Sequence, residues 1–289
     1  RWVGVRRRIY PWRHTPRIAC GDPRIQRVLE AAVNTLRNCA QETCVDGMGR
    51  ERQQYSGDVA HQLQAIRYVF GEQRQPRRFL RTYSEGLTAE GYFMDCWPAY
   101  DRLARLAQRQ MGATRWGPIL DHGVQFGFDC WLHYMETGEK DALAEAFPRL
   151  VRFGHYLEGI VGSDGLLQVD GLGVPTVWVD HHAFAAQHHK RCAFNLYTAA
   201  MLQHALAPIC RLFEDAGAAE EFRRFGREIE DRTAATFWDE ERGLFMDNMP
   251  WIEEEKTPRL SDRSLANAVL FEQCPGGRTG PSVDRYRLV

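Results

Sequence analysis

The sequence has few lysines, almost no excess charge and no long apolar run. Lys140, Lys190 and Lys256 are the only lysines among 37 basic residues, which face 38 acidic residues. The formal net charge of -1 gives no overall basic field, so we expect no nucleic-acid partner. No stretch is apolar enough to span a bilayer, so we expect no membrane partner either.

The eight cysteines lack any C-x-x-C pair, which is the spacing typical of a zinc ribbon. Cys39, Cys130 and Cys210 lie in apolar helical patterns, where a free thiol packs as a small hydrophobic group. We therefore expect reduced cysteines and a cytoplasmic protein. Secretion stays open, because the sequence begins without Met and its N-terminus looks incomplete.

Convincing pairs of β-strands are nearly absent, and helical periodicity takes their place. Asp22 before Pro23 is typical of a helix start, and Gly71, Gly138 and Gly217 are typical of helix ends. The sequence predicts an all-α fold of about nine helices. The clearest apolar stripes cover residues 25–36, 59–70, 124–135, 142–157, 193–213, 220–237 and 264–271.

Three loops resemble one another along the chain. Each has an acidic residue shortly before a glycine and two bulky apolar residues after it, at Gly91, Gly165 and Gly243. The spacings of 74 and 78 residues indicate a repeating helical unit, as in a toroid or solenoid of helical hairpins. The alternative is that acidic-glycine turns recur by chance.

The first 18 residues follow a different pattern. Trp2–Tyr10 is β-prone and partly alternating, and Pro11 and Pro16 interrupt it. We interpret residues 1–18 as the β-type tail of a preceding β-domain, and residues 19–289 as the helical domain.

Carboxylates and arginines concentrate in residues 44–58, CVDGMGRERQQYSGD. The segment holds the acids Asp46, Glu51 and Asp58 together with Arg50 and Arg52. Such a group at a loop–helix junction suits acid/base chemistry on a sugar, since one carboxyl can stay neutral while its neighbours ionise. The alternative is that the acids only cap a helix or form structural ion pairs.

This spacing resembles the catalytic segment of bacterial α-L-rhamnosidases of glycoside hydrolase family 78. Four later segments, at 131–141, 177–180, 237–245 and 267–271, are similar to other parts of the same catalytic domain. The resemblance runs roughly from Ile18 to Phe271 and implies an (α/α)6 barrel of six helical hairpins. We expect the barrel to be incomplete at its C-terminal end, because its last helices find no counterpart here.

The resemblance also implies an inverting hydrolase that releases terminal α-L-rhamnose from an oligosaccharide or glycoside. Glu51 would be the general acid and Asp46 a second catalytic residue, and the pKa of Glu51 would be raised by apolar walls and by Asp46 and Asp58. Asp46 and Asp58 would bind rhamnose hydroxyls, and Arg50 or Arg52 would hold the carboxylates in place.

Two departures from the family concern the loop and the base. Gly47-Met48-Gly49 and Gln53-Gln54-Tyr55 replace the family's C-P-Q and L-G-W, which changes the expected shape of the sugar pocket. The family's general base is a glutamate after the helix that begins near Asn267. No glutamate follows Glu272, so we expect the base beyond Val289.

Trp178 is the expected sugar platform, because pyranose C–H faces pack on indole. A plain core tryptophan is the alternative. Asp180 and His181 follow and are expected to reach sugar hydroxyls. The neighbouring pairs His181–His182 and His188–His189 raise the question of a metal. Adjacent histidines point in different directions, so we expect no metal and no cofactor.

Other functions stay open at this point. A polysaccharide lyase or sugar epimerase would depend on His122, His181 and Tyr197, and a non-catalytic carbohydrate-binding domain would need no base. Two further clusters, Asp95 with Trp97 and Trp116 with Asp121-His122, are expected to be structural. The sequence also leaves an oligomer open.

Overall fold

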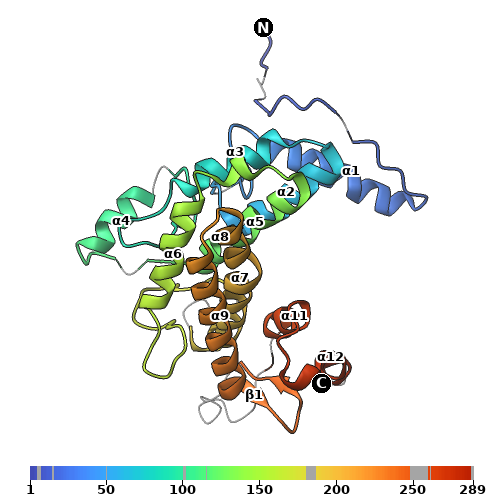
Figure 1. The fold of residues 1–289 in the computed structure, drawn as a ribbon. Coiled ribbons are helices and arrows are strands. Elements are labelled where there is room, and N and C mark those ends of the chain that lie inside the picture. Colours follow the sequence, from blue (N-terminus) through green and yellow to red (C-terminus); the bar gives the residue numbers. More distant parts are fainter. Residues whose placement is uncertain are drawn as a thin grey trace.

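Helices dominate the computed structural model of the chain (Figure 1). Within the described part the only paired strands are β1 (Trp238–Asp239) and β2 (Leu244–Phe245), which are antiparallel. The predicted predominance of helices is therefore confirmed. The structure describes residues 1–4, 8–14, 16–49, 51–99, 102–114, 116–179, 187–247, 260 and 262–287.

Three helix boundaries in the N-terminal half lie where the sequence predicts them. The Asp22 side chain accepts a hydrogen bond from the Arg24 N–H, and Gly71 and Gly138 adopt the left-handed conformation that ends two helices. The helices are α1 (Pro23–Cys39), α2 (Ser56–Phe70), α3 (Arg74–Ser84), α4 (Arg102–Gln110) and α5 (Asp121–Thr137).

The predicted long helix at 193–213 is continuous but irregular. A π-helical segment, Leu202–Leu206, lies between its two α-helical parts. Pro208 follows this segment and has no N–H to donate, which explains a local change of hydrogen-bonding pattern. Gly217 does not end this helix, contrary to prediction. It lies in the first turn of the next one, which Asp215 caps through the Ala218 N–H.

The remaining elements complete the C-terminal half of the described chain. They are η1 (Lys140–Leu143), α6 (Phe147–Gly159), η2 (His188–Lys190), α7 (Arg191–Met201), α8 (Ala207–Leu212), α9 (Ala216–Phe237), α11 (Asp262–Leu270), η4 (Pro275–Gly277) and α12 (Thr279–Tyr286). Helix α9 packs along α7, the π-helical segment and α8, and α5 packs between α2 and α7.

The three similar loops follow α3, α6 and α9 and share one structural device. Each has an antiparallel residue pair closed around a glycine with positive φ. The pairs are Leu87–Phe93, Val161–Leu167 and Trp238–Phe245, and the glycines are Gly91, Gly165 and Gly243. A side chain is disfavoured at such φ values, which explains the repeated glycine. The predicted repeat is confirmed at these loops.

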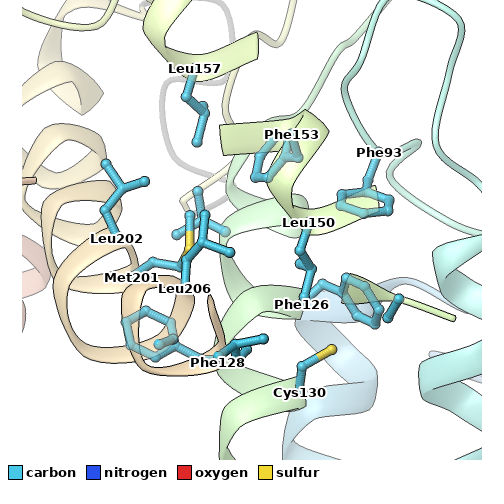
Figure 2. Packing of buried hydrophobic residues seen from close by; sticks show 14 of the residues in the cluster. Phe93, Phe126, Phe128, Cys130, Leu150, Phe153, Leu157, Met201, Leu202 and Leu206 are labelled. Atoms are coloured by element: carbon cyan, nitrogen blue, oxygen red, sulfur yellow. The ribbon is translucent and has the colours of Figure 1, made fainter. Parts of the chain in front are cut away.

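The main core lies where α5, α6 and the α7–π-helical stretch meet (Figure 2). Phe126, Phe153 and Leu206 are fully buried there. A Cβ atom on Gly154 would lie 2.5 Å from the Phe222 ring, so glycine is required for this close approach. Each fully buried Phe or Leu contributes about 1.5–3 kcal/mol relative to an exposed one.

The N-terminal stretch contains no strand among its described residues. The Tyr10 N–H donates to the Ala40 carbonyl at 2.9 Å, and the Trp12 ring lies 4.2 Å from that of Phe70. The expected strand over Trp2–Tyr10 is therefore not found in the residues described. Assignment of residues 1–18 to a preceding β-domain stays a prediction.

All eight cysteines are free, and all but Cys20 are buried. Free thiols agree with the expectation of reduced cysteines, whereas the cellular compartment stays a prediction. Among the described helices, none combines the length and the apolar character needed to cross a membrane.

Candidate active site

A cavity of about 500 Å³ opens where α2, α5, α7 and α11 converge on the segment before η2. A cavity of this size is typical of small-molecule sites. It is lined by Gly57, Asp58, His61, Asp121, His122, Gln125, Trp178, Val179, Ala193, Tyr197, Arg263, Ala266 and Asn267. Acids, histidines, an arginine and an indole thus share one hollow, and Asp58 and Trp178 were both predicted site residues.

Asp58 lies in the first turn of α2 and carries a perturbed carboxyl group. Burial is the main cause of its raised pKa, and the Asp46 charge acts in the same direction. His122 opposes this shift. The Nδ1 atom of His122 accepts from the Gly57 N–H at 3.5 Å, which places the imidazole beside the start of α2. Asp58 is thus a cavity carboxyl that keeps its proton to a higher pH than an exposed aspartate does.

Trp178 is held in place through its backbone. The two carboxylate oxygens of Asp121 accept the N–H groups of Trp178 and Val179, at 2.8 and 2.7 Å. Val179 has a φ of 51°, which is unfavourable for a β-branched residue. Two charge-assisted hydrogen bonds offset that strain. Asp121 therefore fixes the turn that presents Trp178.

Lys190 supports the same turn from η2. Its Nζ atom donates to the Trp178 carbonyl at 2.8 Å and lies 5.8 Å from the centre of the indole ring. Burial lowers the pKa of Lys190 to about 8, with Asp121 acting against the shift. Trp178 is thus bracketed by a carboxylate and an ammonium group, one on its N–H and one on its carbonyl.

Asp121→Asn is expected to lower the free energy of unfolding by about 1–3 kcal/mol, because an amide offers one acceptor oxygen for two N–H groups. Urea unfolding followed by circular dichroism measures this change. The exposed Asp231→Asn serves as the matched control and is expected to have little effect. Equal stability of the two variants would contradict the role given to Asp121.

A second polar chain crosses the cavity wall and was not predicted. The Tyr197 hydroxyl donates to Gln125 Oε1, and Gln125 Nε2 donates to Asp129 Oδ1 at 3.0 Å. Asp129 is only 3% exposed, and burial raises its pKa to about 7. The i,i+4 spacing of Gln125 and Asp129 on α5 was the available signal, since it places both on one helix face.

The predicted catalytic acids Asp46 and Glu51 lie before α2 and are not among the residues lining the cavity. Asp46 Oδ1 accepts from the Gln53 N–H at 2.8 Å, and the Asp46 N–H donates to the Gln53 carbonyl at 2.9 Å. Asp46 thereby closes the loop that leads from it to Gln53. Glu51 is half-buried in the turn within this loop.

Asp46 also borders an apolar groove of about 420 Å³ between α1 and α2. His61 lines both this groove and the cavity, so the two hollows adjoin at α2. Asp46 contributes to the cavity through its charge on Asp58.

Arg52 does not hold a carboxylate in the part of the chain that the structure describes. Its Nε atom donates to the Met48 carbonyl at 3.1 Å, and its φ is 56°. The Arg52 side chain thus folds back on its own loop, and the expectation that Arg50 or Arg52 holds the carboxylates in place stays a prediction. Arg50, Asp180 and His181 lie outside the described residues.

Of the two clusters expected to be structural, the one of Trp116 with Asp121 and His122 divides. Asp121 and His122 line the cavity, whereas Trp116 borders a separate small pocket with Arg109 and with Asp95 of the other cluster. Arg109 donates there to the Trp116 carbonyl at 3.3 Å. Asp121 thus belongs to the site although its direct contacts are structural.

Ligands for a metal ion come together at one place among the residues described. His155 and Glu158 on α6 and Glu221 on α9 bring their ligand atoms within 4.8 Å of one another, and none of the three lines the cavity. His188 belongs to one of the two histidine pairs that raised the question of a metal, and its Nδ1 atom lies 2.8 Å from Asp170 Oδ2.

Comparison with protein families matches residues 13–271 to the bacterial alpha-L-rhamnosidase 6 hairpin glycosidase domain. Comparison with curated proteins gives no match.

Among solved structures, a rhamnosidase from Klebsiella oxytoca with rhamnose bound superposes with a TM-score of 0.73 at 18% identity, over 95% of this chain and 49% of that one. The family 78 rhamnosidase of Bacillus sp. GL1 gives 0.75 at 18% identity, over 96% and 27%. The Streptomyces avermitilis α-L-rhamnosidase complexed with L-rhamnose gives 0.67 at 17% identity, over 93% and 23%. These similarities establish the fold, and the chain spans half or less of the length of each structure.

Proposed function

Because the chain belongs to the family of bacterial alpha-L-rhamnosidase six-hairpin glycosidase domains, we propose that it hydrolyses α-L-rhamnosides, releasing terminal rhamnose with inversion. The observation that carries the proposal is the cavity that holds the Asp58 carboxyl and the Trp178 indole together. A pyranose needs both an apolar surface for its C–H face and acceptors for its hydroxyls.

The roles in this proposal follow the chemistry of an inverting glycosidase. Glu51 protonates the leaving oxygen, and Asp58 accepts hydrogen bonds from rhamnose hydroxyls beside Trp178. Asp46 raises the pKa of Asp58 through its charge and closes the loop that carries Glu51. Inversion also requires a second carboxylate as the base that activates water.

A lyase or epimerase would use His122 as base and Tyr197 as acid, and both line the cavity. Burial raises the pKa of Tyr197 well above its ordinary value of 10, with Asp129 and Asp121 acting in the same direction. This shift makes Tyr197 a weaker general acid, since a catalytic group works best with a pKa near the working pH. Together with the family match, it favours hydrolysis.

Incubation of the full-length protein with an aryl α-L-rhamnoside is expected to release rhamnose whose first detectable anomer is β. Proton NMR during the first minutes distinguishes the anomers before mutarotation equalises them. Release of the α-anomer first would show that hydrolysis retains the anomeric configuration, and would contradict inversion. Absence of rhamnose release from several aryl and alkyl rhamnosides would overturn the proposed function.

A further inference from the structure

We propose that Asp129, Gln125 and Tyr197 form a hydrogen-bonded relay that fixes the Tyr197 hydroxyl as an acceptor toward the cavity, where it selects a sugar hydroxyl that donates to it. The inference rests on the proposed function, because it takes the cavity to be the rhamnoside site. In this arrangement Tyr197 determines specificity, and Asp129 is a positioning residue that acts through Gln125.

The relay begins at the buried carboxyl group of Asp129. Asp129 is 3% exposed, and its Oδ1 accepts from Gln125 Nε2 at 3.0 Å. Among the described residues its Oδ2 atom has no hydrogen-bond partner. Arg67 is the basic residue whose charge acts on Asp129, and its guanidinium already forms an ion pair with Glu136. Gln125 is therefore the hydrogen-bond donor on which Asp129 depends.

This contact sets the orientation of the Gln125 amide. An amide has its oxygen on one side and its NH₂ group on the other, so donation to Asp129 turns Oε1 toward Tyr197. When Asp129 is ionised, above its pKa of about 7, the reversed orientation would place two acceptor oxygens face to face. The ionised Asp129 thus decides which group Gln125 presents to Tyr197.

The orientation of Gln125 in turn determines whether the Tyr197 hydroxyl offers a ligand its proton or its lone pairs. The Tyr197 hydroxyl has one proton, which it donates to Gln125 Oε1. Only lone pairs remain for a ligand. The ring is held by Phe128, stacked at 5.3 Å between centroids with 20° between planes. Gln125 and Tyr197 both line the cavity, so this wall offers an acceptor at a fixed place.

The other charged groups facing the cavity do not replace this acceptor. Asp58 and His61 come from α2, Asp121 and His122 from the start of α5, and Arg263 from α11. Both Asp121 oxygens are occupied by the Trp178–Val179 turn. A substrate without the matching hydroxyl would leave the Tyr197 lone pair unpaired in a mostly buried place, which is the basis of hydroxyl selection.

A double-mutant cycle between protein and substrate tests the relay. The substrates are an aryl α-L-rhamnoside and its 2-, 3- and 4-deoxy analogues, and the variants of the full-length protein are Tyr197→Phe, Gln125→Met, Asp129→Asn and Asp129→Leu. We expect deoxygenation at one position to lower kcat/KM of the wild type by about 3- to 10-fold through that contact. In Tyr197→Phe the same deoxygenation should add no loss.

Gln125→Met and Asp129→Leu should abolish the coupling as well, because the phenol proton then lacks its fixed acceptor. Asp129→Asn should reduce the coupling without abolishing it, since an amide accepts from Gln125 in only one of its two orientations. Tyr68→Phe is the matched control: Tyr68 is exposed and donates to Glu136. A purely structural role of Tyr197 would lower kcat/KM equally for all four substrates, and that result would overturn the relay.

Calorimetric titration with rhamnose and the three deoxyrhamnoses repeats the cycle without turnover. Rhamnoside hydrolysis by the wild type without coupling to Tyr197 would overturn the relay and leave the proposed function standing. Neither hydrolysis nor rhamnose binding by the wild type would overturn the proposed function, and the relay with it. Coupling in binding alone supports the relay even where hydrolysis fails.

Discussion

Glu51→Gln is expected to lower kcat of the full-length protein by about 10²- to 10⁴-fold on an alkyl α-L-rhamnoside, whose leaving group needs a proton. On a dinitrophenyl rhamnoside, which leaves as a stable anion, the loss should be far smaller. The glutamine keeps the size and polarity of the side chain, so rhamnose affinity should change little. Steady-state kinetics on the two substrates, with rhamnose titration, measures all three.

Asp58→Asn tests whether Asp58 only binds the sugar or is itself the general acid. Because Asp58 is proposed to accept sugar hydroxyls, its replacement should lower kcat/KM by similar factors on both substrates. The exposed Glu228→Gln is the matched control and should leave both rates unchanged. Rescue of Asp58→Asn, and not of Glu51→Gln, by the dinitrophenyl leaving group would transfer the role of acid to Asp58.

Local signals made much of the fold predictable. Asp22, Gly71 and Gly138 mark helix ends through backbone geometry that depends on single residues. Helix α3 was missed because arginines dominate its sequence, RQPRRFLRTYS, while Phe79 and Tyr83 form a narrow buried stripe. Gly217 was misread because Asp215, two residues earlier, starts a helix that accepts a glycine in its first turn.

The site was predictable in part, for a physical reason. The carboxyl group of Asp58 and the indole of Trp178 indicate sugar binding by residue type alone, and the structure brings both to the cavity. Asp121 was expected to be structural, and its carboxylate does hold the Trp178–Val179 turn, but its partner Trp178 lies 57 residues away and was not predictable. Gln125 acquires its function only from its two partners. Pairings across such distances depend on tertiary packing, which periodicity does not encode.

Asp129→Asn is expected to change how stability depends on pH. Burial raises the pKa of Asp129 from 3.8 to about 7 in the folded protein. A raised folded pKa means that the native state keeps a proton which the unfolded chain has lost. The contribution of Asp129 is therefore fully present below about pH 4 and is lost as the pH rises through 7. Asparagine removes this titration while it keeps the acceptor for Gln125.

The wild type should therefore lose up to about 4 kcal/mol of unfolding free energy relative to Asp129→Asn between pH 4 and pH 8, with a slope of at most about 1.4 kcal/mol per pH unit. Arg67 does not prevent the loss, because Glu136 already pairs with its guanidinium. Urea unfolding of both proteins across this range measures the difference, with Asp231→Asn as the exposed control. A difference between wild type and Asp129→Asn that is constant with pH would show that Asp129 is ionised in the folded protein throughout this range, as a better-compensated buried carboxylate would be.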